Sequence, residues 1–256
     1  MNEAVERVVA YLYEQYDQPI TLADMADVAF LSQFHFARTF REVTGVSPSR
    51  FLSAIRLQRA QGLLRTTELT VTDISYMVGY NSLGTFTSRF TKSVGVTPIQ
   101  YRCFSQANLA AGFTGGTGGT GPDRADLGAL AGWTTSAAGA GDLHVYIGVF
   151  DGPILQHLPV SCALVETGTA FHLDGIPEGE WYVFAAAVHP DEPPAAGYGV
   201  RVARLVCREG PVKSVGGQTT MVDLPMRPAR ATDPPVLLAL PVAVTWLPAA
   251  SVLHAT

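Results

Sequence analysis

The feature of this sequence that most constrains its fold is a unit that occurs twice near the N-terminus. Residues Ile20–Ala26 recur 49 positions later as Leu69–Ser75. After one additional residue in the second copy the offset becomes 50, which gives these matches: Phe40 with Phe90, Gly45 with Gly95, Val46-Ser47-Pro48 with Val96-Thr97-Pro98, and Phe51 with Tyr101. A unit repeated in this way predicts two copies of one supersecondary structure.

Each copy carries the start and stop signals of two short helices joined by a turn. Hydroxyl or amide residues that can cap a helix precede each predicted helix: Thr21, Ser32, Thr70, and Asn81 or Ser82. Asp24 and Asp73, three residues after each threonine, can complete a capping box. The second helix of each copy has phenylalanines four residues apart and a glycine at its end. One longer helix over 48–64, with Arg56 and Arg59 outward, is predicted to hold the two units at a fixed separation.

Charge is divided unevenly along the chain. The net charge is −5, but residues 1–105 hold 10 Lys+Arg and 9 Asp+Glu, net +1, whereas residues 106–256 hold 7 and 13, net −6. Between Ser32 and Arg65 there are six arginines and one carboxylate, Glu42, a local charge of +5. Such a stretch fits either a surface that faces nucleic-acid phosphates or a solvated face whose counter-charges come from neighbouring helices.

Composition divides the chain into three parts. Helical spacing of apolar residues predicts an all-α domain over 1–105. Residues 106–141 are rich in Gly, Thr and Ala, with a run at Gly112–Pro122 that can bury almost nothing, and they are predicted to be a linker. Residues 142–256 contain short β-rich runs between frequent Pro and Gly, which predicts an all-β, sandwich-like domain. The predicted fold class is therefore multidomain, α and then β.

Both units match one family pattern in residues as well as spacing. The first reads SQFHFARTF over Ser32–Phe40, followed by Gly45-Val46-Ser47-Pro48. The second reads GYNSLGTFTSRF over Gly79–Phe90, followed by GVTPIQYR over Gly95–Arg102. This tandem, about two-fifths of the chain, resembles the DNA-binding domain of the AraC/XylS family. The resemblance implies about seven helices and a sequence-specific transcription regulator, of the activator type common in that family.

The resemblance also implies that one recognition helix of each unit enters a major groove, and that the two contact successive turns of one duplex face. The outward residues predicted for the first recognition helix are Gln33, Phe34, Ala37, Arg38 and Arg41. Arg38 can pair with guanine, Gln33 with adenine and Phe34 with a thymine methyl, while Arg41 is expected at a phosphate. His35 is expected to be half-buried on the inner face.

The second recognition helix is predicted to be a weaker reader. Its candidate DNA-binding residues are Ser82, Leu83, Gly84, Thr85, Thr87, Ser88 and Lys92. Ser88 stands where the family commonly has arginine, so this helix has fewer groups that could discriminate between bases.

The C-terminal half has candidate strands at 143–150, 160–166, 169–174, 180–189, 199–207, 219–224 and 236–247. Phe171–Phe184, with Pro177-Glu178-Gly179 in its middle, weakly resembles a strand-turn-strand segment of carboxypeptidase-regulatory or transthyretin-like β-sandwiches. The aromatic residues Trp181, Tyr182, Tyr198 and Trp246 fit either core positions or a pocket. The domain is predicted to sense a small ligand, or alternatively to serve only dimerisation or partner docking.

Other classes of protein find little support. The N-terminus is acidic where a secretion signal would be basic, and the apolar run Val236–Leu247 is shorter than the ~20 residues of a membrane helix. Cys103, Cys162 and Cys207 are expected to be buried thiols, and the histidines lack metal-ligand spacing. We therefore expect a cytoplasmic protein that is not an enzyme, with no metal, cofactor or membrane. Its expected partners are double-stranded DNA, an unknown effector, a second copy of the chain and RNA polymerase.

Two recognition helices joined by a stiff helix must contact their two DNA subsites at a fixed helical phase of the duplex. Inserting about half a DNA turn, roughly 5 base pairs, between the subsites should abolish tight binding, and a whole-turn insertion should not restore it. Titrations of the three duplexes with the protein check this. Binding that survives the half-turn insertion would mean that only one unit engages DNA.

Overall fold

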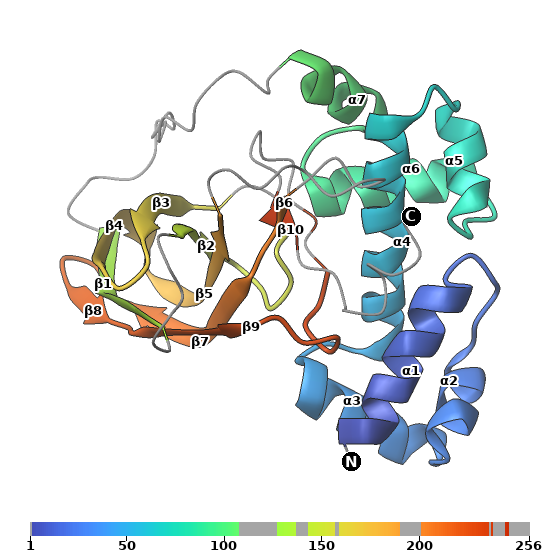
Figure 1. Cartoon of the computed structure of the whole chain (residues 1–256), viewed down its shortest axis with the longest axis horizontal. Helices are drawn as coiled ribbons and strands as arrows, with labels where there is room; N and C mark the ends of the chain where they lie inside the picture. The colour runs from blue at the N-terminus through green and yellow to red at the C-terminus, as the bar shows by residue number, and fades with distance from the viewer. Residues whose placement is uncertain are drawn as a thin grey trace.

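The computed structural model describes residues 2–107, 127–136, 143–156, 159–189, 201–235, 237 and 244–245. Within these ranges the N-terminal region holds seven helices: α1 (Asn2–Gln15), α2 (Leu22–Ala29), α3 (Gln33–Thr44), α4 (Pro48–Thr66), α5 (Val71–Met77), α6 (Leu83–Val94) and α7 (Pro98–Ala107). Helices α1 to α3 surround one half of α4, and α5 to α7 surround the other half (Figure 1). The predicted tandem of helix-turn-helix units is confirmed.

The predicted helix caps are formed by side chains. Thr21 Oγ1 accepts a hydrogen bond from Asp24 N at 3.2 Å, and Thr21 N donates to Asp24 Oδ2 at 2.7 Å. Thr70 and Asp73 form the same capping box in the second unit. Of the two candidates for the cap of α6, Asn81 and Ser82, the cap is Ser82, whose side chain accepts from the Thr85 N–H at 3.2 Å.

Helix α4 lies at the centre of the helical region, and most of its residues are buried. Its buried residues do not form one stripe: Pro48, Phe51, Leu52, Ala54, Ile55, Leu57, Gln58, Ala60, Gln61, Gly62 and Leu64. The prediction that Arg56 and Arg59 point outward is wrong. Arg56 donates to the carbonyl oxygens of Tyr16 and Gln18 at 2.6 and 2.7 Å, and Arg59 lies over the Tyr16 ring at 5.3 Å. Both arginines therefore bind the end of α1 to α4.

The C-terminal region is rich in β-strands. Eight of the described strands share one sheet: β1 (Leu127–Ser136), β2 (His144–Phe150), β3 (Ser161–Glu166), β4 (Ala170–Pro177), β5 (Gly179–Val188), β7 (Leu205–Ser214), β8 (Thr219–Met221) and β9 (Leu224–Pro228). Their order is β3-β2-β5-β7-β9-β1-β4, with β8 beside β1. Two further short strands, β6 (Arg201–Val202) and β10 (Val244–Thr245), pair with each other.

The sheet curls into a nearly closed barrel because of its connectivity. Strands β3 and β4 stand at opposite ends of the strand order, yet only residues 167–169 join them. The Thr134 hydroxyl of β1 accepts the Gly168 N–H at 3.0 Å and so fixes this turn. Buried side chains such as Leu130, Val145 and Leu173 share one core cluster. The β-rich prediction is confirmed, but the eight main strands form one curled sheet, whereas a sandwich would have two stacked sheets.

Strand β1 lies inside the segment predicted to be a linker. Residues 127–136 pair with β4, β8 and β9, so the barrel begins well before residue 142, and most of the rest of 106–141 lies outside the described residues. Two glycines of this segment, both in β1, are required by the close approach of neighbouring backbone. A Cβ at Gly128 would lie 2.6 Å from the Val215 carbonyl oxygen, and one at Gly132 would overlap the Val222 carbonyl oxygen.

Three other predictions for the β region are changed or left open. The strands on either side of Pro177-Glu178-Gly179 do not pair, because β4 pairs with β1 while β5 pairs with β2 and β7. The segment is thus a corner of the barrel. Trp181 donates its indole N–H to the Pro177 carbonyl at 2.8 Å, which gives it a structural role at this corner. Tyr198 and Trp246 lie outside the described residues.

The cysteines differ in environment. Cys207 is buried, and burial together with the neighbouring Glu209 raises its pKa to about 12, so it stays a thiol. Cys103 is exposed and Cys162 half-buried, so the expectation of buried thiols holds for Cys207 alone. In the described part of the chain no group of three His, Cys, Asp or Glu side chains could hold a metal ion, and no helix could cross a membrane.

Gly79 sits where the second unit meets the end of α1. Its φ is +83°, and an added Cβ would lie 2.7 Å from the Asp17 carbonyl oxygen. We expect Gly79→Ala to lower the free energy of unfolding by about 2–4 kcal/mol, because it adds left-handed strain to a backbone clash. The matched control is Gly84→Ala in α6, where a Cβ meets nothing within 4 Å and should be neutral or slightly stabilising. Urea denaturation measures both, and equal midpoints would contradict the argument.

Candidate nucleic-acid interface

Helices α3 and α6 each bury one face and expose the other. Phe36 and Phe40 in α3, and Phe86 and Phe90 in α6, are completely buried. Most of the predicted DNA-binding residues are exposed: Gln33, Phe34, Arg38, Arg41, Ser82, Leu83, Gly84, Thr85, Ser88 and Lys92. Ala37 and Thr87 are half-buried. The structure therefore gathers these residues on two helix faces, and their contact with DNA remains a prediction.

The exposed face of α3 includes one large apolar side chain that contacts solvent. Phe34, in the first turn of α3, is 83% exposed. Burial of the Phe34 ring against a partner contributes favourable hydrophobic free energy. An exposed aromatic residue beside cationic ones suits contact with a base edge or a thymine methyl. His35 is also exposed, contrary to its predicted half-buried place, since it lies about 100° around the helix from the buried Phe36.

The predicted guanine reader has a carboxylate partner one turn along its helix. Arg38 Nε donates to Glu42 Oε1 at 2.9 Å, although the two side chains are 72% and 55% exposed. The hydrogen bond and charge of Glu42 raise the pKa of Arg38, so this side chain is charged under all ordinary conditions.

The α6 face is more neutral and partly occupied by its own cap. The Ser82 hydroxyl donates to Thr85 Oγ1 at 2.8 Å and accepts the Thr85 N–H, so these two predicted contacts also hold the start of α6 in place. Leu83 is 38% exposed, and Ser88 and Lys92 are exposed farther along the helix.

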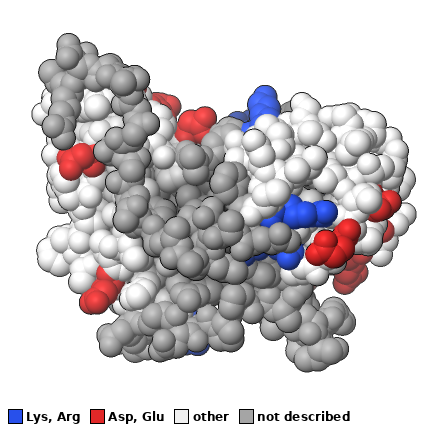
Figure 2. Space-filling view, turned by 90° about the horizontal axis from the view of Figure 1, so that it is seen from above, with Lys and Arg blue, Asp and Glu red and all other residues white. Residues whose placement is uncertain are grey.

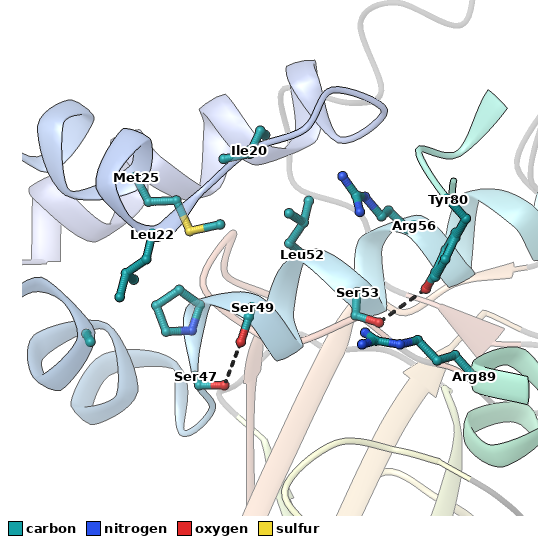
Figure 3. A pocket seen from close by; sticks show the side chains of 12 residues that line it. Ile20, Leu22, Met25, Ser47, Ser49, Leu52, Ser53, Arg56, Tyr80 and Arg89 are labelled. Carbon is teal, nitrogen blue, oxygen red and sulfur yellow. Dashed lines mark hydrogen bonds between the residues drawn. The ribbon is translucent and has the colours of Figure 1, made fainter. Parts of the chain in front are cut away.

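Between the two units lies a hollow of about 340 Å³ beside the first turns of α4 (Figure 3). Ala37 lines it, so it adjoins the predicted reading face of α3. Figure 3 shows Arg56 and Arg89 beside the hollow with two hydrogen-bonded pairs of hydroxyls, Ser47 with Ser49 at 3.5 Å and Ser53 with Tyr80 at 3.3 Å. Burial, with a smaller contribution from Arg89, lowers the pKa of Arg56. Arg89 was not among the predicted DNA-binding residues, because it lies one residue after Ser88, about 100° around the helix, but its side chain is exposed.

Charge differs between the two ends of the molecule. In the view of Figure 2 the visible basic side chains lie in the middle and towards the helices. The charged side chains visible on the outer part of the barrel are acidic. Acidic side chains are also visible at the helical end, so on this face that end carries charges of both signs.

The barrel contacts the C-terminal ends of both recognition helices. Arg208 Nη1 donates to the Thr44 carbonyl at the end of α3 at 3.0 Å, and Gln156 Nε2 donates to Ser93 Oγ near the end of α6 at 3.5 Å. Ile154 and Leu237 are completely or almost completely buried within the helical core. Sequence reasoning missed these residues, since they lie in a region predicted to be a separate domain and follow no helical period.

The geometry defines a class of protein with two helix-turn-helix units, each of which exposes one face of its second helix, α3 or α6. A helix-turn-helix domain model matches residues 25–103. The Transposon Tn10 TetD protein of Escherichia coli is 34% identical over 98 residues, which cover 38% of this chain and 71% of TetD. With these matches, and with the family's residue pattern kept in both units, the chain belongs to the AraC/XylS family through its N-terminal region.

Other relatives match over the same fraction of the chain. The melibiose operon regulatory protein of Escherichia coli strain K12 is 31% identical over 102 residues, 40% of this chain and 34% of that protein. The DNA-binding domain of AdpA, solved in complex with a target DNA, is 29% identical and covers 42% of this chain and 97% of that domain, with a TM-score of 0.40. The chain spans about a third to a half of the length of the first curated relatives it matches.

Arg38 and Arg41 offer a matched pair of substitutions on one helix. We expect Arg38→Ala to cost about 1–3 kcal/mol on the preferred duplex and to relax its sequence preference, because a bidentate base contact is lost. Arg41→Ala should weaken all sequences alike and reduce the salt dependence. Titrations on the preferred and a scrambled duplex measure both effects. Equal losses on the two duplexes for Arg38→Ala would remove it as a base reader.

Proposed function

We propose that the chain is a sequence-specific DNA-binding transcription regulator whose recognition helices α3 and α6 enter two successive major grooves of one duplex. The observation that carries this proposal is the pair of exposed helix faces held by one largely buried helix, α4. Such a support fixes the spacing of two readers and favours a single asymmetric site per chain. The names of the relatives, which include the melibiose operon regulatory protein, support a role in transcription.

The two helices divide the work of recognition unequally. Helix α3 presents Arg38 and Phe34, groups that can distinguish bases, whereas α6 has Ser88 and Gly84 at the corresponding positions of the repeat. Arg56 and Arg89 in the hollow between the units suit the backbone phosphates that would run between two grooves. In this arrangement α3 supplies most of the specificity and α6 mainly anchors the duplex. The proposal includes no enzymatic step.

Selection of bound duplexes from a random DNA pool tests the proposal. The full-length protein should enrich one sequence, and should bind it at least ~100-fold more tightly than a scrambled duplex at physiological salt. Affinity for both duplexes should fall steeply as salt rises, since arginines replace counterions at the phosphates. A protein that enriches no sequence, or that binds both duplexes equally, is not a sequence-specific regulator.

The barrel has a route by which to influence DNA binding, because it contacts the ends of both recognition helices. Beside this contact lies a cavity of about 510 Å³ whose lining includes Arg50, Arg89, Lys92 and the barrel-side residue Gln156. The interior of the barrel is itself packed with side chains. We therefore place the predicted ligand-sensing function at the junction. A ligand that binds the folded protein raises its melting temperature. If no compound of a metabolite panel does so, the alternative of dimerisation or partner docking is favoured.

Arg208 provides a test of the junction itself. Its guanidinium is largely buried, which lowers its pKa, and it satisfies a carbonyl at the end of α3, where a cation also stabilises the helix dipole. We expect Arg208→Ala to cost about 1–3 kcal/mol of folding free energy and to speed hydrogen exchange around residues 41–47. The control Lys213→Ala removes an equal charge from an exposed position on the same strand. Exchange that is unchanged in both variants would show that the junction does not act on α3.

A further inference from the structure

Glu42 is a carboxylate in a place where a DNA-binding surface should avoid one. It is the only acidic residue between Ser32 and Arg65, a stretch with six arginines. It is exposed on α3, one helical turn after Arg38. A carboxylate beside a duplex is repelled by the phosphates, so its presence on this helix lowers affinity for DNA of any sequence.

The contact that Glu42 makes leaves the reading atoms of Arg38 available. Its Oε1 accepts from Arg38 Nε at 2.9 Å, whereas the end-on edge of the guanidinium is formed by the two terminal Nη groups. Guanine is recognised through two acceptors, O6 and N7, which a guanidinium meets with two N–H groups. The two interactions are therefore geometrically compatible, since one guanidinium can donate to the carboxylate and to the base at the same time.

We propose that Glu42 is the positioning residue for base recognition by Arg38, which it holds extended with both Nη groups presented to a guanine. This inference rests on the proposed DNA-binding function and deepens it. An exposed ion pair of this kind adds little to folding stability, so the effect of Glu42 falls on recognition. A free arginine loses much rotamer entropy when it binds a base, and an arginine already held in one orientation loses less.

The second unit lacks this device. With the repeat offset of 50, Arg38 and Glu42 correspond to Ser88 and Lys92. A serine and a lysine cannot form such a pair, and Lys92 adds attraction to phosphate where Glu42 adds repulsion. The difference assigns sequence discrimination to α3, because Glu42 weakens non-specific binding and strengthens the specific contact on the same helix.

The test uses the full-length chain, the selected duplex and a scrambled duplex. Glu42→Ala should lower the ratio of specific to scrambled affinity about 3- to 10-fold, while binding to the scrambled duplex becomes tighter. Glu42→Gln, which keeps an oxygen acceptor for Nε, should recover part of the ratio. The control Glu14→Ala makes the same change of charge at an exposed position of α1 and should leave the ratio unchanged.

A double-mutant cycle separates positioning from direct reading by Glu42, whose carboxylate could also accept from a cytosine amino group. In the Arg38→Ala background, Glu42→Ala should leave the ratio unchanged. At the guanine whose preference is lost in Arg38→Ala, replacement by 7-deazaguanine, which lacks the N7 acceptor, should penalise the wild type more than Glu42→Ala.

Three outcomes overturn the inference. An unchanged ratio in Glu42→Ala would show that the ion pair plays no part in recognition. An equal loss with and without Arg38 would make Glu42 a reader in its own right. A wild type that prefers the selected site without any contribution from Arg38 would remove the group that Glu42 positions. These results leave the proposed function standing, whereas a wild type with no sequence preference would overturn both.

Discussion

The burial of most of α4 beneath both helix-turn-helix units is the constraint on which the other features of the molecule depend. Helices of the first unit cover one half of it and helices of the second unit the other (Figure 1). Arg56 and Arg59 add contacts from α4 to the end of α1. The Arg56 guanidinium donates to backbone carbonyls there, and the Arg59 guanidinium lies over the Tyr16 ring. Because a close-packed helix cannot rotate or slide without loss of its contacts, the two recognition faces keep one separation and one phase.

The two units are copies in topology but differ in chemistry. At the turn between α2 and α3 the exposed Phe30 takes a left-handed conformation with φ 58°, whereas the second unit has Gly79, with φ 83°, at the corresponding place. Left-handed backbone is costly for a side chain with a Cβ and inexpensive for glycine. The first unit also holds the Arg38 and Glu42 pair and receives Arg208 from the barrel. The first unit therefore differs from the second both in its backbone conformation, at Phe30, and in its side-chain contacts, at Arg38 and with Arg208.

Local signals made the helical region predictable from sequence. Capping threonines, phenylalanine pairs and terminal glycines each act within one or two turns, so spacing alone located Thr21, Phe36 and Gly45 in their correct roles. Long-range effects were not predictable. Position 132 in β1 requires a glycine because the Val222 backbone, ninety residues along the chain, lies too close for a side chain. The Arg208 contact likewise joins residues 164 positions apart. For the candidate site, the exposed faces could be predicted, and the spacing of Arg38 and Glu42 by one helical turn permits their pairing, whereas the hollow at Arg89 could not be predicted.

The place of Leu237 in the helical core has a consequence for the order in which the protein matures. Apart from Ile154, the other buried residues of that core lie between Val5 and Tyr101, and the Leu237 backbone N–H donates to the Leu155 carbonyl at 3.0 Å. During synthesis the helices leave the ribosome long before residue 237 does. One side of α4 is therefore exposed to solvent while the strands are still being made. Domains generally form in the order of their synthesis, and exposed apolar surface on an early one invites association with other chains. The nascent helical region is therefore the stage at which this protein depends most on protection from aggregation.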